Sequence, residues 1–298
     1  MNRAKSGMVM PMDRKSIGVC SWSLQPDCPD SLVDLLGETG VESLQLALSP
    51  IVEQPGVWGG AVEKLRKAGI EILSGMMAMK DEDYSTLESI ARTGGVRPDE
   101  TWEANLTHAK EVAQLASEVG IDLVTFHAGF LPEHAADPER EKLIARLNDL
   151  AFLFDPYGID IALETGQETA TTLSEVLADI NQPNLGVNFD PANMILYGKG
   201  DPVEALKKLA PQVMQIHIKD ALPSECPGEW GTEMPMGQGA VNWPGFFTIA
   251  REKVPPVNFI IEREAGANRI GDIRAAYELI TSQQGEKVVR RIGGETLP

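Results

Sequence analysis

The sequence predicts a single-domain (β/α)8 barrel, the TIM-barrel architecture, over residues 16–298. Apolar, strand-like runs alternate with helix-like segments, eight such pairs can be counted, and no change in composition marks a domain boundary. Strict alternation of strands and helices indicates a parallel sheet. The structural alternative is an open, doubly wound sheet. It is disfavoured because the segment after the first strand, "CSWSLQPDCPD", lacks a glycine-rich phosphate fingerprint.

The eight expected strands are short apolar runs, several of them with alternating polar residues. They cover residues 16–23, 42–48, 71–79, 122–129, 160–166, 185–191, 213–220 and 259–266. Apolar residues at helical spacing, often followed by glycine, predict a helix after each strand. These helices fall within residues 31–40, 59–69, 100–120, 138–155, 172–180, 202–210, 246–253 and 273–284. Residues 1–15 carry neither pattern, and we expect a flexible N-terminal segment there.

Composition and charge restrict the class of function. The chain of 298 residues is 43% hydrophobic and 23% charged, which is typical of a globular protein with a sizeable core. A formal net charge of -18 disfavours nucleic acid as a partner, because phosphate backbones are bound by clustered Lys and Arg. The three cysteines form no C-x-x-C pair, and no apolar run suits a signal peptide or a membrane span. We therefore expect a cytoplasmic protein with no membrane partner; homo-oligomerisation is compatible with the fold.

Residues that can bind a metal end the last four predicted strands. They are Glu164 in "ALETG", Asp190 in "NFDPAN", His217 in "QIHIKD" and Glu262 in "IIERE". In a (β/α)8 barrel the C-terminal strand ends meet at one mouth and carry the chemistry. Three carboxylates and an imidazole brought together there would repel one another and be costly to bury without a cation between them. The sequence therefore predicts a divalent metal site made by these four side chains.

The ligand types indicate which metal this site would hold. Mixed carboxylate and imidazole ligands suit Mn²⁺, Zn²⁺, Co²⁺ or Fe²⁺ better than Ca²⁺. With one imidazole and no thiolate, Mn²⁺ is the first choice, and Mg²⁺ also fits. Taken singly, each ligand has an ordinary structural explanation. Asp190, for example, precedes a proline in a sequence typical of a turn. The prediction depends on finding all four at consecutive strand ends.

The four motifs, in this order, resemble those of the sugar phosphate isomerase/epimerase superfamily, the xylose-isomerase-like TIM barrels. The resemblance covers nearly the whole chain, from "GVCSWS" onward. It implies that the four residues hold one divalent cation and that Glu164 and Glu262 are also the catalytic acid/base pair. The implied enzyme is a metal-dependent isomerase or epimerase of a ketose or related keto-polyol. Such an enzyme moves the proton α to the carbonyl through a metal-stabilised enediolate.

Further side chains are expected to contact the carbohydrate substrate. By alternation His127, at the end of the fourth strand, and Lys219, two residues after His217, face inward. Trp22 ends the first predicted strand, where an aromatic ring could stack on a sugar. Each has an alternative explanation. His127 could be a core or supporting group, Trp22 could plug the barrel, and Lys219 could pair with Asp190.

The segment from residue 221 to residue 243 is rich in glycine and proline and follows the strand that carries His217. We expect it to form a lid over the barrel mouth that excludes water during the reaction. A lid would bring Glu229, Trp230 and Glu233 close to the substrate. The alternative is an ordinary long connection.

Two features bear on which sugar is bound. Asn193 stands three positions after Asp190, where the ketose epimerases of the resembled superfamily carry a substrate-binding histidine. This departure weighs against a free-ketose epimerase, although Asn193 remains a candidate substrate contact. Few cations stand at the strand ends, so an unphosphorylated substrate is favoured. Arg263 and Arg269 are the exceptions, and Arg263 is a further candidate substrate contact.

Three rival functions follow from the same residues. A dehydratase (lyase) could use the same metal scaffold and would need a leaving-group acid in addition. A sugar-binding barrel without catalysis would not need both Glu164 and Glu262. An endonuclease for abasic DNA, from the same superfamily, needs several more histidines at the barrel rim, whereas the chain has four in all.

Overall fold

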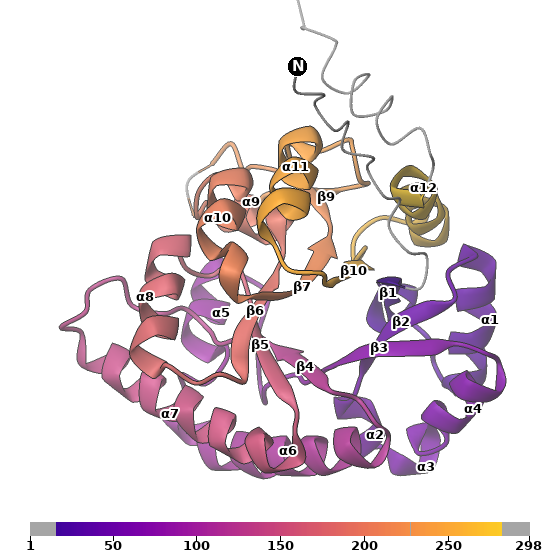
Figure 1. Ribbon diagram of the computed structural model, residues 1–298, viewed down its shortest axis with the longest axis horizontal. Helices are drawn as coiled ribbons and strands as arrows, with labels where there is room; N and C mark the ends of the chain where they lie inside the picture. The colour runs from indigo at the N-terminus through magenta and orange to yellow at the C-terminus, as the bar shows by residue number, and fades with distance from the viewer. Residues whose placement is uncertain (1–15, 227, 282–298) are drawn as a thin grey trace, which may run out of the picture.

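A computed structural model describes residues 16–226 and 228–281, and it contains the predicted closed barrel (Figure 1). Eight strands pair in parallel in the order β1-β10-β7-β6-β5-β4-β3-β2. Their bounds are β1 (Ile17–Cys20), β2 (Ser43–Ala47), β3 (Glu71–Met76), β4 (Leu123–Phe126), β5 (Asp160–Glu164), β6 (Leu185–Phe189), β7 (Val213–Ile218) and β10 (Asn258–Ile261). The sequence-based prediction of a single (β/α)8 barrel is thus confirmed.

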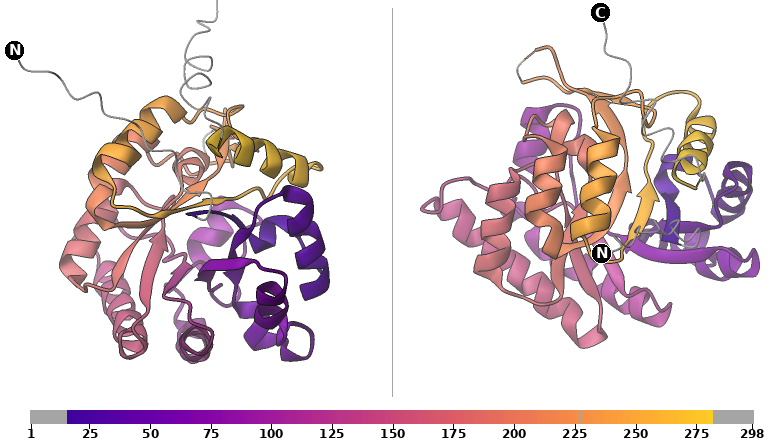
Figure 2. Two further views of the ribbon diagram at one scale, coloured as in Figure 1. Left: turned by 45° about the vertical axis from the view of Figure 1, so that its right-hand side comes forward. Right: turned by 45° about the horizontal axis from the view of Figure 1, so that its top comes forward.

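Helices form a ring outside the strands, and the two views of Figure 2 show the same arrangement from other sides. The longer ones are α1 (Pro29–Thr39), α4 (Ala61–Lys67), α6 (Asp99–Glu118), α7 (Pro138–Phe154), α8 (Ala170–Ile180), α10 (Pro202–Leu209), α11 (Trp243–Lys253) and α12 (Arg269–Thr281). Their apolar faces pack on the barrel and bury most of the hydrophobic core between helices and strands. No helix of the described ranges is long and apolar enough to cross a membrane.

Short elements that the sequence did not predict lie at the C-terminal ends of the strands. They are η2 (Ser21–Leu24), α2 (Ser49–Glu53), α3 (Pro55–Trp58), α5 (Leu87–Thr93), α9 (Pro191–Leu196) and the antiparallel pair β8 (Asp220–Leu222) and β9 (Thr232–Met234). The proline after Asp190 was the one interpreted as part of a turn. In α2, α3 and α9 prolines occupy the first helical turn, where a missing N–H costs nothing.

Several strands end earlier than predicted. The first stops at Cys20, so Trp22 lies in the following 3-10 helix and not in the strand; β4 ends at Phe126, just before His127. The apolar runs continue past the strand ends because the loops at the mouth are buried too, and hydrophobicity alone does not mark where the backbone leaves the sheet. Residues 282–284 of the last predicted helix and the predicted N-terminal segment 1–15 lie outside the described residues.

A layer of fully buried polar side chains crosses the barrel interior. Ser74 of β3 donates to Oε1 of Gln215 on β7 at 2.6 Å, although these two strands are not neighbours in the sheet. Gln215 in turn donates to Oδ1 of Asn188 at 3.2 Å, and Gln45 donates to Thr125 at 2.8 Å. Buried polar groups are tolerated when they are hydrogen-bonded. The layer therefore forms a polar floor directly beneath the C-terminal mouth.

Candidate metal centre

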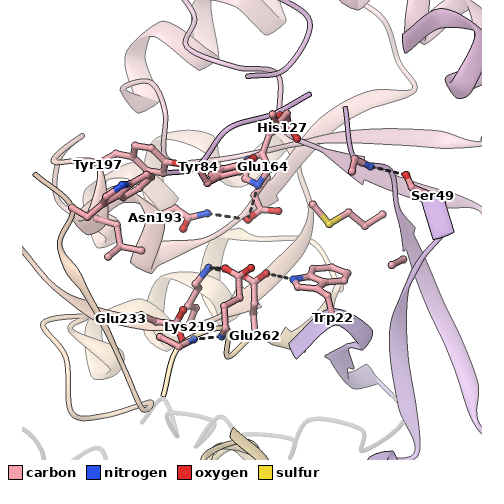
Figure 3. A pocket seen from close by; sticks show the side chains of 18 of the residues that line it. Trp22, Ser49, Tyr84, His127, Glu164, Asn193, Tyr197, Lys219, Glu233 and Glu262 are labelled. Carbon is pink, nitrogen blue, oxygen red and sulfur yellow. Dashed lines mark hydrogen bonds and ion pairs between the residues drawn. The ribbon is translucent and has the colours of Figure 1, made fainter. Parts of the chain in front are cut away.

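The four predicted ligands meet at the C-terminal mouth of the barrel. Glu164 is the last residue of β5, Asp190 follows β6, His217 lies in β7 and Glu262 follows β10. These strands are consecutive neighbours in the barrel. One ligand atom from each residue lies within 4.8 Å of the others, and all four side chains are buried. The sequence prediction that they converge is therefore met in the geometry (Figure 3 shows Glu164 and Glu262).

His217 points one ring nitrogen at the three carboxylates. Its Nδ1 lies 3.6 Å from Oε1 of Glu164, 3.8 Å from Oδ2 of Asp190 and 3.4 Å from Oε2 of Glu262. Its Nε2 lies 2.8 Å from Oε1 of Gln45, an acceptor, and 3.1 Å from Nδ2 of Asn188; a proton on Nε2 donated to Gln45 leaves Nδ1 available as a ligand. Nδ1 is buried and has no hydrogen-bond partner among the described residues. A buried, unpartnered imidazole nitrogen facing three carboxylates fits a cation site.

Asp190 divides its two oxygens between structure and site. Oδ1 caps α9 by accepting hydrogen bonds from the backbone N–H of Ala192 at 2.7 Å and of Asn193 at 3.0 Å. Oδ2 is buried without a hydrogen-bond partner and faces His217. Burial raises the pKa of Asp190, against the opposing effect of His217 and Lys219. The turn explanation and the ligand explanation thus hold for different oxygens of one side chain.

Both oxygens of Glu262 accept hydrogen bonds. Oε1 accepts from Nε1 of Trp22 at 2.7 Å, and Oε2 accepts from Nζ of Lys219 at 2.9 Å. Burial by itself raises the pKa of Glu262, but Lys219 and His217 together lower it more, so that the pKa lies well below its usual range. Lys219 also donates to Glu264 at 2.8 Å, and its Nζ lies 3.9 Å from Oδ2 of Asp190, the alternative partner that the sequence offered.

Glu164 is held from the opposite side of the site. Its Oε1 accepts from Nδ2 of Asn193 at 2.9 Å, and His127 Nε2 lies 3.7 Å from the same oxygen. Burial raises the pKa of Glu164, but His127 and His217 outweigh it and the net shift is downward. Gly166 allows this arrangement: it has φ +136°, and a Cβ there would come within 2.4 Å of Cβ of Asn193. A side chain at position 166 would therefore displace Asn193 from Glu164.

A cavity of about 730 Å³ opens above the four ligands. Of the sequence-predicted substrate contacts, the lining includes Trp22, His127, Asn193, Lys219, Trp230 and Glu233. Sequence reasoning missed several lining residues, among them Tyr84, Tyr197 and Glu82. They stand in irregular segments after the strands, where no periodic pattern marks them.

Arg263, a predicted substrate contact, lies outside the described lining of the cavity. Its guanidinium donates to Glu233 at 2.6 Å and to Asp272 at 2.9 Å. Glu229, expected near the substrate, is also absent from the lining. Arg263 follows Glu262 directly, and neighbouring side chains in extended backbone point to opposite sides. It therefore fastens the segment that carries Glu233 and does not face the cavity.

The segment after β7 covers part of the mouth, as the lid interpretation expected. Trp230 and Glu233 line the cavity, and the Trp230 ring packs edge-on against Tyr197 with centroids 4.8 Å apart. Asp220 anchors the segment: its carboxylate accepts bonds from Trp243 Nε1 and from four backbone N–H groups, those of residues 221, 237, 239 and 241. The covering segment is thus fastened at its base.

Known proteins match most of the chain. The family model described as xylose isomerase-like TIM barrel matches residues 35–283. The structure of a xylose isomerase domain protein from Planctomyces limnophilus is 32% identical with a TM-score of 0.76, covering 88% of this chain and 94% of that one. The uncharacterized protein YihM of Escherichia coli is 28% identical over 194 residues, which span 62% of this chain and 58% of YihM, less than two thirds of its length.

More distant structures share the fold alone. The probable 3-DHS dehydratase AsbF from Bacillus anthracis is 18% identical with a TM-score of 0.69, covering 90% of this chain and 99% of that one. The 3-keto-D-glucoside 4-epimerase YcjR from E. coli is 12% identical with a TM-score of 0.67, covering 89% and 98%. With the family match extending over most of its length, the chain belongs to the xylose isomerase-like TIM barrel family.

Proposed function

We propose that the protein is a divalent-metal-dependent enzyme that moves a proton α to the carbonyl of a ketose or related keto-polyol, as an isomerase or epimerase. One observation carries the proposal. Four buried ligand-type side chains converge, and two of their atoms, Nδ1 of His217 and Oδ2 of Asp190, are buried without a hydrogen-bond partner. A cation between them would satisfy both atoms and offset the repulsion among the carboxylates.

Glu164, Asp190, His217 and Glu262 would hold the cation. Three carboxylates with one imidazole favour Mn²⁺, although Mg²⁺, Co²⁺ and Zn²⁺ remain alternatives for the same ligands. When bound, the ion supplies positive charge that stabilises the negative charge developing on oxygen as the α-proton leaves. The residues around it bind the substrate, orient it and move the proton.

Glu164 and Glu262 would act as the acid/base pair. Both line the cavity. Glu164 ends β5 and Glu262 follows β10, and these two strands flank β6 and β7 in the barrel. A proton taken by one carboxylate and returned by the other to the opposite face gives epimerisation; return to the neighbouring carbon gives isomerisation. Trp22 and Lys219 hold Glu262 in a fixed orientation, and Asn193 does the same for Glu164.

The charge of the cavity supports an unphosphorylated substrate. Among the charged residues of the described lining carboxylates predominate, and Lys219 is the one lysine or arginine there. Lys219 is already paired with Glu262 and Glu264. A phosphate group would meet a field of its own sign. Substrate hydroxyls would instead bind His127, Asn193, Lys219 and Glu233.

A dehydratase is the second candidate, and His127 favours it. Elimination of a β-hydroxyl needs an acid beside the leaving group, in addition to the base that removes the α-proton. His127 lines the cavity, its Nε2 is 3.7 Å from Glu164, and its buried Nδ1 has no hydrogen-bond partner. The same active site could therefore supply a leaving-group acid.

Metal content and proton exchange test the proposal together. The parent chain, a Glu164→Gln/His217→Ala double variant and a Glu133→Gln/His134→Ala control are prepared identically with Mn²⁺; the control makes the same changes in an exposed loop. We expect about one metal ion per chain in the parent and the control and none in the first variant. A parent that stays metal-free with Mn²⁺, Co²⁺ and Zn²⁺ would refute the metal site.

A panel of ketoses and keto-polyols in D2O then tests the chemistry by NMR. Isomerase, epimerase and dehydratase all remove the α-proton; the first two return deuterium to carbon, the dehydratase releases the β-hydroxyl as water, and the product identifies which of them operates. Exchange should require Mn²⁺ and be absent from the Glu164→Gln/His217→Ala variant. Binding of a sugar with no exchange of its α-proton would instead support the non-catalytic, sugar-binding barrel.

A further inference from the structure

The cavity above the candidate metal centre has two unlike halves. Over β4 to β7 and β10, most of the lining side chains are polar: His127, Glu164, Asn193, Tyr197, Lys219, Glu262 and Glu264, with Leu196, Trp230 and Ala265 beside them. Over β1 to β3 the lining includes Trp22, Ala47, Pro50, Met76 and Ala78, which together we term the apolar shelf. The loop after β3 adds Glu82, whose Oε1 accepts from the backbone N–H of Gly95, and Tyr84, whose ring packs edge-on against His127. Figure 3 shows the two halves: Trp22 lies on one side of Glu164 and Glu262, and Tyr197 on the other.

The apolar shelf is one continuous surface. Strands β1, β2 and β3 are neighbours in the barrel, and Ala47 and Met76 pair directly in the register of β2 and β3. Just beyond the strands, the backbone N–H of Ala78 donates to Oγ of Ser49 at 3.0 Å and ties the two loops together. The shelf therefore rests on hydrogen-bonded backbone and is formed before any ligand binds.

The polar side chains that the loop after β2 adds to the cavity already have partners. Oγ of Ser49 lies 2.8 Å from Nε2 of His108, and Glu53 pairs with Lys80. The one polar atom of the shelf's own side chains, Nε1 of Trp22, donates to Glu262. A sugar hydroxyl placed on the shelf would lose its bonds to water without replacement, which costs free energy. An apolar group placed there would gain free energy by leaving water.

We propose that the apolar shelf binds an apolar aryl or alkyl substituent of the substrate. This inference rests on the proposed function and adds a substrate class to it: a keto-polyol or keto-sugar joined to an apolar group. The polyol end lies against Glu164 and Lys219, and the apolar end lies on Met76 and Ala78. The cavity of about 730 Å³ is in the range that takes ligands of drug size, so it can hold both parts.

Two hydroxamates test this without knowledge of the sugar. Acetohydroxamate and phenylacetohydroxamate present the same pair of metal-binding oxygens, and they differ only in the phenyl group. Their affinities for the Mn²⁺-loaded chain are measured by isothermal titration calorimetry. We expect phenylacetohydroxamate to bind at least about tenfold more tightly, because its ring leaves water for the shelf.

Variants test whether the preference for phenylacetohydroxamate arises from binding at the apolar shelf. Met76→Gln replaces an apolar side chain with a polar one of similar size, and Met214→Gln makes the same change at the opposite end of the barrel. We expect Met76→Gln to remove most of the phenyl advantage, measured as the ratio of the two affinities, and Met214→Gln to retain it. Ala78→Asn, at an exposed position, provides a second shelf variant with the same expected result.

The outcomes separate this inference from the proposed function. A chain that binds Mn²⁺ and acetohydroxamate but shows no preference for the phenyl compound overturns the apolar subsite alone. A preference that persists in both Met76→Gln and Ala78→Asn also overturns it, because the ring must then bind elsewhere. A chain that binds no Mn²⁺ overturns the proposed function, and this inference with it.

Discussion

The indole Nε1–H of Trp22 donates a hydrogen bond of 2.7 Å to Oε1 of Glu262, across 240 residues of sequence. The other oxygen of Glu262 accepts from Lys219. The carboxylate is therefore held at both oxygens, and its orientation toward His217 is fixed. Groups that orient a metal ligand by hydrogen bonding raise the affinity of the site for the metal.

Replacing Trp22 with phenylalanine should weaken the metal site. The variant keeps an aromatic ring on the shelf but removes the hydrogen bond to Glu262, so we expect Mn²⁺ affinity to fall by about 10- to 100-fold. Isothermal titration calorimetry with Mn²⁺ measures this affinity. Trp58→Phe makes the same change outside the cavity lining and should bind Mn²⁺ like the parent. Unchanged affinity in Trp22→Phe would show that this hydrogen bond has no part in the site.

Metal binding should raise thermal stability. A ligand that binds only the folded state at about 100 times its Kd adds about 2.7 kcal/mol to the free energy of unfolding. We therefore expect the Tm to rise on addition of Mn²⁺ and to fall again with EDTA. The Glu164→Gln/His217→Ala variant should show no rise, and Glu133→Gln/His134→Ala should respond like the parent. Equal shifts in all three chains would place the metal elsewhere.

Asp220 should be needed for the stability of the covering segment. Its Oδ2 accepts from Gly237, Gly239 and Trp243 Nε1, and its Oδ1 accepts from two more backbone N–H groups. In Asp220→Asn the amide N–H2 group would therefore face N–H donors in either orientation of the side chain. We expect a loss of about 2 to 4 kcal/mol in the free energy of unfolding measured with urea. Faster amide hydrogen exchange in residues 228–243 should accompany it.

Asp201→Asn is the matched control for that change. Asp201 is exposed and caps α10 through Oδ1 alone, which accepts from two backbone N–H groups. Asparagine caps helices as well as aspartate does, so this variant should lose little stability. Similar losses in the two variants would mean that the five bonds to Asp220 contribute no more than an ordinary cap.

The barrel and its four candidate ligands could be predicted because each follows from a local pattern. Apolar runs gave the strands, and Glu164, Asp190, His217 and Glu262 each stand where such a run ends. The supporting contacts could not be predicted in this way. Gln45 reaches His217 across 172 residues of sequence, and nothing in the local sequence identifies such a partner.

Arg263 shows a different limit of the sequence. It was a candidate substrate contact because it is one of the few cations at the strand ends, but its guanidinium pairs with Glu233 and Asp272. The direction of a side chain just beyond a strand depends on where the backbone leaves the sheet. For the same reason the sequence extended the first strand as far as Trp22, although it ends at Cys20.

Glu168 gives a prediction for the pH dependence of stability. Its side chain is buried, and burial raises its pKa from 4.5 to about 8, with Lys199 opposing the shift. Between these two pH values the folded state keeps a proton that the unfolded state has released, so this group makes the free energy of unfolding fall as pH rises. Glu168→Gln removes that dependence. At pH 8 the variant should be more stable than the parent by on the order of 4 kcal/mol.

Urea unfolding at pH 5, 6, 7 and 8 measures the effect of Glu168. The difference in free energy of unfolding between Glu168→Gln and the parent should grow steadily over this range. Ionising a buried carboxyl costs free energy in the folded state, and only the parent has that carboxyl at position 168. Glu133→Gln, at an exposed position, is the control and should give a curve parallel to that of the parent. If the curve of Glu168→Gln is also parallel, the Glu168 carboxyl reaches solvent or a cation in the folded protein.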